Sequence, residues 1–191
     1  MKPAPTDTPA LTPALPRSFH LALRRHGVLP SRFAFAANVA TQRMALFEKN
    51  GHAKDYSYRK TFRISTSRFG ISQVQDSNGT PLGLHRIARK IGGGYPIGTV
   101  FKGRRPIGLT WQGMPDGAIA HRILWLEGLE PGFNRGGNVD TFRRYVYIHG
   151  FADETTLGRP MSCGCIHLAA SDLMPLYERM PVGTLVWITA R

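Results

Sequence analysis

Apolar and polar residues alternate in short runs along most of the chain, with the two-residue period of half-buried β-strands. Turn signals such as Asn50-Gly51 and Asn78-Gly79-Thr80-Pro81 separate the runs, and Gly92-Gly93-Gly94 interrupts regular structure. The pattern predicts strands at residues 44–47, 56–65, 82–87, 122–127, 142–149 and 185–189. Because there is no internal repeat and no alternation of strands with helices, we expect a mainly β fold.

Helical patterns are confined to the two ends of the chain. Ser18 is a suitable N-cap for a helix over residues 19–26, and a second Ser-led segment from Ser31 fits another short helix, although its alanines and phenylalanines leave a strand open. Near the C-terminus, Ser171 or Asp172 is expected to cap a helix directly after the two cysteines. We therefore expect a disordered Pro-rich segment (1–17), a short helical extension (18–41) and one main domain (42–191).

The predicted strand 142–149 carries the first candidate functional residue. Its alternation places His149, Tyr147, Tyr145 and Arg143 on one face. His149 therefore stands at a strand end, on a face of polar and aromatic groups.

Charge is the strongest signal in the composition. The formal net charge is +13, which would attract nucleic acid, acidic polymers or anionic substrates, or serve solubility alone. No basic run is interleaved with aromatic residues, and no zinc-finger, basic-zipper or RNA-recognition pattern is present. We therefore expect anionic ligands and no nucleic-acid partner.

Neither end of the chain carries a targeting or membrane pattern. The first 16 residues contain Pro3, Pro5, Pro9, Pro13 and Pro16, which prevents an apolar helix of the secretory type. No stretch approaches the roughly 20 apolar residues of a membrane span. This predicts a cytoplasmic protein without a membrane span, or a periplasmic or wall protein if a leader has been removed.

Both cysteines lie in one stretch, Ser162-Cys163-Gly164-Cys165-Ile166-His167. Three chemistries can use such a cluster: a thiolate nucleophile with an imidazole base, a zinc site, or a dithiol switch. A disulfide between residues i and i+2 would be strained and would close a trivial loop, so the pair does not staple the fold.

The three chemistries differ in how well the spacing supports them. For catalysis, the helix expected after Cys165 would lower its thiol pKa, and Gly164 would let backbone N–H groups converge on an oxyanion. For zinc, Cys163, Cys165, His149 and His167 supply suitable ligands, but at an uncommon spacing. For redox chemistry, Cys163 would act as a resolving thiol, which is compatible with catalysis.

Several motifs together resemble the L,D-transpeptidase catalytic domain family. They occur in the family's order over residues 42–188: Ser65-Thr66-Ser67, Thr80-Pro81-Leu82-Gly83-Leu84-His85-Arg86-Ile87, Tyr147-Ile148-His149-Gly150, Gly158, Pro160, Ser162-x-Gly164-Cys165-Ile166, Asp172 and Val182-Gly183-Thr184. The resemblance implies a β-rich, sandwich-like catalytic domain that needs no cofactor or metal. Its cysteine would attack the carbonyl that joins meso-diaminopimelate to the terminal D-alanine of a peptidoglycan tetrapeptide.

The resemblance also implies roles for single residues. Cys165 matches the nucleophile and His149 its base, while Ser162 and Gly164 match the residues that shape the loop. Gly150 and the two positions that depart from the family pattern are expected to lie along the substrate. These departures are Cys163, where relatives have histidine, and His167, where they have arginine. An arginine elsewhere would then hold the substrate carboxylate, and the candidates are Arg122, Arg143 and Arg144.

The family contains two reaction outcomes. The stretches 90–100 and 122–132 are similar to a cytoplasmic branch that uses water as acceptor, which implies an L,D-carboxypeptidase acting on muropeptide tetrapeptides in peptidoglycan recycling. A transpeptidase, in which an amine takes the acyl group, is the alternative. A second alternative is a basic binding module that binds anionic wall fragments without catalysing a reaction. The sequence makes no prediction of oligomeric state.

Overall fold

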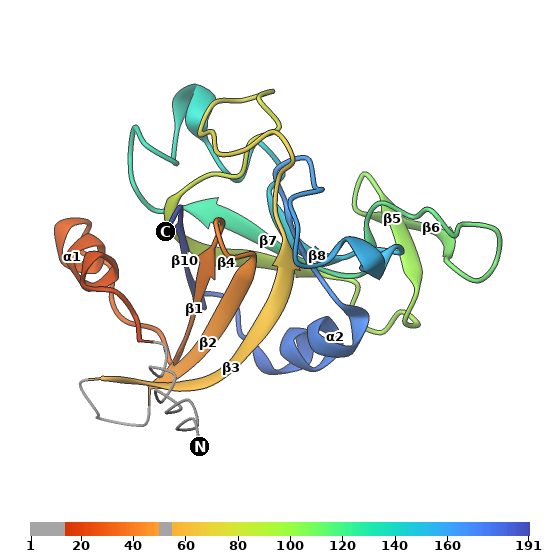
Figure 1. Cartoon of the computed structure of the whole chain (residues 1–191), viewed down its shortest axis with the longest axis horizontal. Coiled ribbons are helices and arrows are strands. Elements are labelled where there is room, and N and C mark those ends of the chain that lie inside the picture. The colour runs from red at the N-terminus through yellow and green to blue at the C-terminus, as the bar shows by residue number, and fades with distance from the viewer. Residues whose placement is uncertain (1–13, 50–54) are drawn as a thin grey trace, which may run out of the picture.

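The computed structural model describes residues 14–49 and 55–191, so the predicted Asn50-Gly51 turn and most of the predicted segment 1–17 lie outside the described residues. The mainly β fold is confirmed (Figure 1). The strands are β1 (Phe33–Asn38), β2 (Arg43–Lys49), β3 (Tyr56–Ser65), β4 (Gly83–Ile91), β5 (Thr99–Lys102), β6 (Arg105–Leu109), β7 (Ala120–Gly128), β8 (Tyr147–Gly150), β9 (Ile166–Leu168) and β10 (Leu185–Thr189). The helices are α1 (Arg17–Arg25) and α2 (Ala170–Arg179), with 3₁₀ turns η1 (Gly137–Val139) and η2 (Glu154–Thr156).

The described strands form one sheet in the order β4-β10-β1-β2-β3-β9-β8-β7-β5-β6. Strand β4 also pairs with β7, so the strands from β4 round to β7 close into a ring. The hairpin β5–β6 lies outside this ring and is attached to β7. Closure removes the open sheet edge within the ring.

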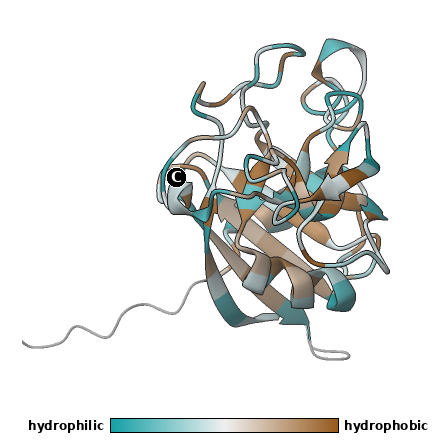
Figure 2. Ribbon diagram, turned by 90° about the vertical axis from the view of Figure 1, so that its right-hand side faces the viewer, coloured by the Kyte–Doolittle hydropathy of each residue, from teal (hydrophilic) through white to brown (hydrophobic). Residues whose placement is uncertain are grey.

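The main core lies between the ring and helix α2. Strands of the ring point residues into it, as Phe35 and Ala37 do from β1, and α2 adds Leu173 and Leu176. In Figure 2 the hydrophobic positions gather on the strands, while the hydrophilic ones gather in the loops. Within β1, the core residues Phe33, Phe35 and Ala37 follow the two-residue period read from the sequence.

Two smaller apolar clusters cover parts of the outer face of the sheet. Helix α1 packs Phe19 and Leu23 against Ala34 of β1 and Leu185 of β10. The second cluster consists of Phe101, Ile123, Trp125 and Tyr147, with Ile91, Ile119, Phe142 and Cys165 packed against it. The proposed nucleophile therefore lies against the outer cluster on β7 and β8, not in the main core.

The expected second helix in the extension 18–41 is wrong, because residues 33–38 form strand β1 in the middle of the sheet. Strand β1 pairs with β2 and β10, and its Phe33 and Phe35 are buried, so tertiary packing on both faces decides the conformation of this apolar segment. Helix α1 is present, but its N-cap is Pro16 and no side chain caps it, so Ser18 is not the cap.

The predicted strand 142–149 is also shorter than expected, since only β8 is extended. Asp140 accepts a hydrogen bond from Arg143 N, and Tyr145 N donates to Phe142 O, which together form turns. Tyr145 has a positive φ of 57°. The alternation argument therefore holds for Tyr147 and His149 but not for Arg143 and Tyr145.

Helix α2 is present after the cysteines, but neither Ser171 nor Asp172 caps it. Its N-cap is Ala169, and the N–H of Ala170 donates to Glu154 Oε1 at 2.6 Å. A side chain from another segment thus satisfies the first turn.

Candidate active site

Two parallel strands bring the two sequence motifs together. Strand β8 pairs with β9 so that Ile148 lies opposite Ile166 and His149 lies opposite His167. Both isoleucines point into the main core, which places the two histidines on the other face. Cys165 directly precedes β9, and its Sγ accepts a hydrogen bond from Tyr147 N at 3.4 Å.

Ser162 holds the loop that presents Cys165. Its hydroxyl donates to Cys165 O at 2.6 Å and accepts from Gly164 N at 3.3 Å. Its backbone N–H donates to Thr66 O at 2.9 Å, which ties the loop to the predicted Ser-Thr motif. Ser162 is buried, so its hydroxyl acts within the loop and not on solvent.

Gly164 lets the loop bend between the two cysteines. It has a φ of +111°, and a Cβ at this position would lie 3.2 Å from Gly79 O. Both features disfavour any residue with a side chain. The loop shape predicted for Ser162 and Gly164 is therefore visible in their contacts.

His149 has the tautomer that a general base needs. Its Nδ1 lies 2.7 Å from Gly150 O, and because a carbonyl can only accept, Nδ1 carries the hydrogen. This leaves Nε2 unprotonated. Burial lowers the pKa of His149 to about 4, so the ring is neutral at neutral pH.

Gly150 contributes to the site through its backbone. Its carbonyl orients His149, and a Cβ on Gly150 would overlap the ring of His121 and Ala120 O. Gly150 therefore leaves room for a second histidine next to the base.

His121 is a site residue to which the sequence analysis gave no role. Its Nδ1 accepts a hydrogen bond from Gly98 N at 2.8 Å, so the hydrogen lies on Nε2. Burial lowers the pKa of His121, so the neutral ring is favoured, and any protonation of His121 would lower the pKa of His149 further. His121 has a positive φ of 69°, which is uncommon outside glycine, and the sequence carries no signal for this.

His167 cannot supply the charge of the arginine it replaces. Its ring lies edge-to-face with His149 at 4.7 Å and stacks on Phe151 at 4.5 Å. Burial lowers its pKa to about 3. Its Nδ1 is buried and has no hydrogen-bond partner among the described residues.

Arg144 and Arg143 lie at the cysteine loop. They line a cavity of about 150 Å³ together with Cys163, Gly164 and Cys165. The guanidinium of Arg144 donates to Ser72 O at 3.1 Å and to Gly79 O at 2.7 Å. Arg143 is exposed. The cavity therefore combines both thiols with two cations.

Arg122 does not join this cavity. Only 4% of it is exposed, its Nη1 donates to His121 O, and its guanidinium lies 5.4 Å from the ring of Tyr177 on α2. The alternation along β7 explains this. Arg122 lies on the same face as Leu124, which points into the main core, whereas Ile123 and Trp125 point to the opposite face, where Cys165 lies. The expected substrate contact of Arg122 is not supported.

Cys165 is a protonated thiol in the free protein. Burial raises its pKa to about 12, although the Tyr147 N–H and Arg144 both favour the thiolate. The first N–H of α2 donates to Glu154 Oε1 and not to the Cys165 sulfur. The thiol therefore needs a base before it can attack.

Aromatic rings and a further arginine form another wall near Cys165. Arg104 Nη1 donates a hydrogen bond to the Tyr147 hydroxyl at 3.5 Å, and the Arg104 guanidinium lies 4.7 Å from the ring of Tyr145. Trp125 stacks on Phe142 at 4.1 Å. Arg104 belongs to the turn of the β5–β6 hairpin, which the sequence did not predict.

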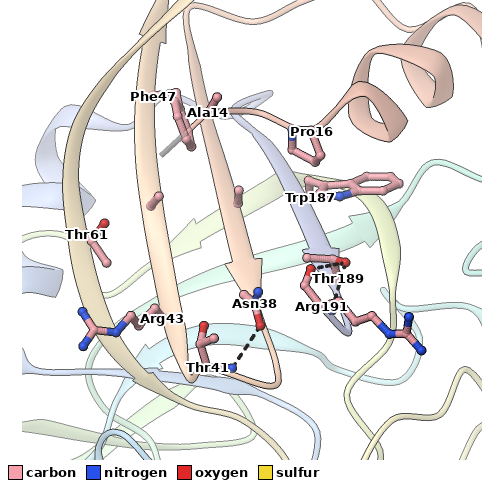
Figure 3. Close-up of a pocket in the computed structure, with 12 residues that line it drawn as sticks. Ala14, Pro16, Asn38, Thr41, Arg43, Phe47, Thr61, Trp187, Thr189 and Arg191 are labelled. Atoms are coloured by element: carbon pink, nitrogen blue, oxygen red, sulfur yellow. Dashed lines mark hydrogen bonds between the residues drawn. The ribbon is translucent and has the colours of Figure 1, made fainter. Parts of the chain in front are cut away.

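A different pocket lies on the outer face of β1, β2, β3 and β10 (Figure 3). It has a volume of about 280 Å³, and no cysteine or histidine lines it.

Within residues 14–49 and 55–191, no group of three or more His, Cys, Asp or Glu residues could hold a metal ion. In the same residues no helix is long and apolar enough to cross a membrane.

Comparison with known proteins identifies the family of the chain. Residues 32–188 match the family of the L,D-transpeptidase catalytic domain (YkuD). No curated protein is matched by its sequence.

Two solved structures share the fold. Bd1075 of Bdellovibrio bacteriovorus has a TM-score of 0.54 at 14% identity, over 84% of this chain and 49% of its own. The L,D-transpeptidase LdtMt1 in complex with imipenem has a TM-score of 0.51 at 16% identity, over 83% of this chain and 59% of its own. The alignments thus span about half to three fifths of these relatives. Since the family match covers most of the chain and includes both Cys165 and His149, the chain belongs to the L,D-transpeptidase catalytic domain family.

Proposed function

We propose that the protein is a cysteine acyl-transfer enzyme that cleaves the bond between meso-diaminopimelate and D-alanine in peptidoglycan tetrapeptides. The observation that carries this is the pairing of β8 with β9, which puts His149, with a free Nε2, beside the segment that begins at Cys165. A neutral imidazole that accepts the thiol proton is one of the ways in which a cysteine nucleophile is activated.

The first half of the reaction forms a thioester. His149 Nε2 takes the proton of Cys165, and the sulfur attacks the scissile carbonyl carbon. The Tyr147 N–H, which is bonded to Sγ, stabilises the negative charge on sulfur as the proton leaves. Backbone N–H groups of the loop 163–165 are the candidates to stabilise the oxyanion. When the carbonyl re-forms, the C–N bond breaks and the D-alanine nitrogen takes the proton from His149.

The second half decides the type of enzyme. In our proposal, water attacks the thioester and releases a tripeptide, so the protein is an L,D-carboxypeptidase of peptidoglycan recycling. The support is the resemblance of stretches 90–100 and 122–132 to the hydrolytic branch. A cytoplasmic location belongs to this proposal, and cell fractionation with an antibody would test it.

L,D-transpeptidation is the second candidate, because solved relatives of the same fold carry that name. Incubation of the purified protein with tetrapeptide, with and without an amine acceptor, separates the two. Release of D-alanine and tripeptide in both arms supports hydrolysis, while a new amide product in the second arm supports transfer. Cys165→Ala should abolish both, and its retention of full activity would overturn the assignment.

A basic binding module without chemistry remains to be distinguished from both enzymes. Imipenem is a suitable probe, because it is bound in the solved LdtMt1 structure. Mass spectrometry should find one covalent adduct on Cys165 of the intact protein. Tetrapeptide binding without turnover and without an adduct would instead support the binding module.

Arg143 and Arg144 are proposed to hold the carboxylate of the leaving D-alanine, since they line the cavity beside Cys165 and no acidic residue other than Asp76 does. Arg143→Gln should lower kcat/KM by about tenfold, as expected for a lost charged hydrogen bond of roughly 1.5 kcal/mol. Arg143 is exposed, so the variant should fold.

A substrate control distinguishes recognition from a structural effect. Amidation of the D-alanine carboxylate should weaken turnover by the unmodified protein and leave little further loss in Arg143→Gln. If Arg143→Gln lowers kcat/KM by the same factor for the natural and for the amidated substrate, Arg143 does not contact this carboxylate.

A further inference from the structure

Cys163 is the residue of the cysteine loop to which the proposed reaction gives no task. It is exposed, while Cys165 is partly buried, and both are free thiols. Both line the same cavity of about 150 Å³. Two thiols in one solvent-connected cavity are a chemical feature that a single nucleophile does not need.

The chain between the two cysteines is bent, not extended. Gly164 has a φ of +111°, and the Ser162 hydroxyl bridges Gly164 N and Cys165 O. Two residues apart, the Cα atoms are at most about 7 Å from one another even in a fully extended chain. A bend shortens this separation towards the roughly 4.4–6.8 Å that disulfides span.

Electrostatics agree with this proximity. A negative charge on Cys163 raises the pKa of Cys165, and Arg144 acts on the same sulfur in the opposite sense. Gly164 has no side chain to stand between the two cysteines. This interaction is in accord with two thiols that border one cavity.

We propose that Cys163 and Cys165 are a thiol–disulfide exchange site, where small disulfides convert the pair into a reversible intramolecular bond that blocks the nucleophile.

The reaction is complete with a small disulfide R–S–S–R as the oxidant. Exposed Cys163 loses its proton to solvent, attacks one sulfur, forms Cys163–S–S–R and releases the first thiolate. Cys165 then loses its proton and attacks the sulfur of Cys163, which breaks the mixed disulfide and releases the second thiolate. Two protein thiols are oxidised, one R–S–S–R is reduced, and the two protons end on two R–SH molecules.

A strained disulfide does little to stabilise the fold, but because it is easily reduced it can form and break reversibly. A bridge between residues i and i+2 removes little chain entropy and is reduced easily. Reduction by an excess of monothiol or dithiol should therefore restore both thiols. The loop is stabilised by its own hydrogen bonds in the reduced protein, so the fold does not depend on the bond.

Intact-mass spectrometry on the unmodified protein tests the site without any assay of turnover. After treatment with oxidised glutathione and removal of excess reagent, the protein should be lighter by two hydrogen atoms, carry no glutathione and resist alkylation at both cysteines. Dithiothreitol should restore the original mass. A stable glutathione adduct, an intermolecular dimer or two alkylatable thiols would each overturn the proposal.

Cys163→Ser and Cys165→Ala serve as matched variants, each compared with its own reduced form. Cys163→Ser should never lose two hydrogen atoms, whereas Cys165→Ala should keep a glutathione adduct on Cys163. Because these masses do not depend on catalysis, failure of the proposed enzyme activity and failure of the disulfide are separate results. If Cys165→Ala takes up no glutathione, Cys163 is not the entry thiol and the proposal is wrong.

Discussion

The proposed catalytic pair consists of two groups that are both uncharged near neutral pH. Burial lowers the pKa of His149 to about 4 and raises that of Cys165 to about 12. A preformed ion pair is therefore absent in the free protein, and the proton must move when the substrate is bound. The cost is offset by groups that favour the thiolate, namely Tyr147 N–H and Arg144.

This predicts an unusual pH profile at the residue scale. Because neutral His149 is the base, kcat/KM should stay level between pH 5 and 8 and fall only towards pH 4. An unperturbed histidine would already lose activity near its usual pKa of about 6.5. The measurement is kcat/KM for D-alanine release in overlapping buffers, with circular dichroism at each pH as the control for folding. A half-maximal rate near pH 6.5 in the folded protein would contradict the assigned protonation state.

At the scale of elements, the N-terminus of α2 offers a direct contrast between sequence and structure. The sequence favours Ser171 or Asp172 as the cap, whereas Glu154 accepts the bond from Ala170 N. Asp172 instead pairs with exposed Lys60 at 2.7 Å. Glu154→Ala should destabilise the protein by about 1 kcal/mol, as is typical for a lost cap, while Asp172→Ala should cost less than about 0.5 kcal/mol.

Urea unfolding of both variants measures these differences through the shift in the transition midpoint. The two substitutions remove one carboxylate each, so their effect on net charge is the same. A larger loss for Asp172→Ala would mean that the helix depends on the ion pair with Lys60 and not on Glu154.

The elements found from the sequence are those whose pattern is long enough to repeat. Alternation over ten residues identifies β3, whereas β9 has three residues and β5 has four, too few for a period. The sequence leaves β1 open between helix and strand because Ala and Phe occur in both, and only its pairing with β2 and β10 settles the choice. Segment 141–145 forms a turn because Asp140 bonds its backbone, which alternation cannot reveal.

The candidate site divides in the same way. Cys165 and His149 could be selected from the sequence because their motifs are local, and Ser162 and Gly164 lie within one of them. His121 and Arg104 could not, since they come from other segments and reach the site only through the pairing of β7 with β8 and the hairpin β5–β6. Arg122 was misjudged because charge alone does not tell which face of β7 it occupies.

At the scale of the whole molecule, the closed sheet holds several neutral histidines, and burial shifts the pKa of three of them strongly. Burial lowers the pKa of His85 and His149 to about 4 and that of His167 to about 3. An unfolded chain has these groups near their usual pKa of about 6.5. Between these values the unfolded state binds more protons, so stability should rise with pH from 4 to 6.5 and be lost as pH falls.

The expected loss of stability between pH 7 and pH 5 is large enough to test whether the histidines are buried in the neutral form. At pH 5 each histidine should cost on the order of 1–2 kcal/mol relative to pH 7, so thermal unfolding at the two pH values should differ by many degrees. The carboxylates do not explain such a loss, because Glu48 and Asp140 have lowered pKa values and stay ionised at pH 5. His167→Phe removes one of the three groups and keeps an aromatic ring against Phe151, so its loss between pH 7 and pH 5 should be smaller than that of the parent. An equal loss in the variant would show that His167 is not held neutral in the folded protein.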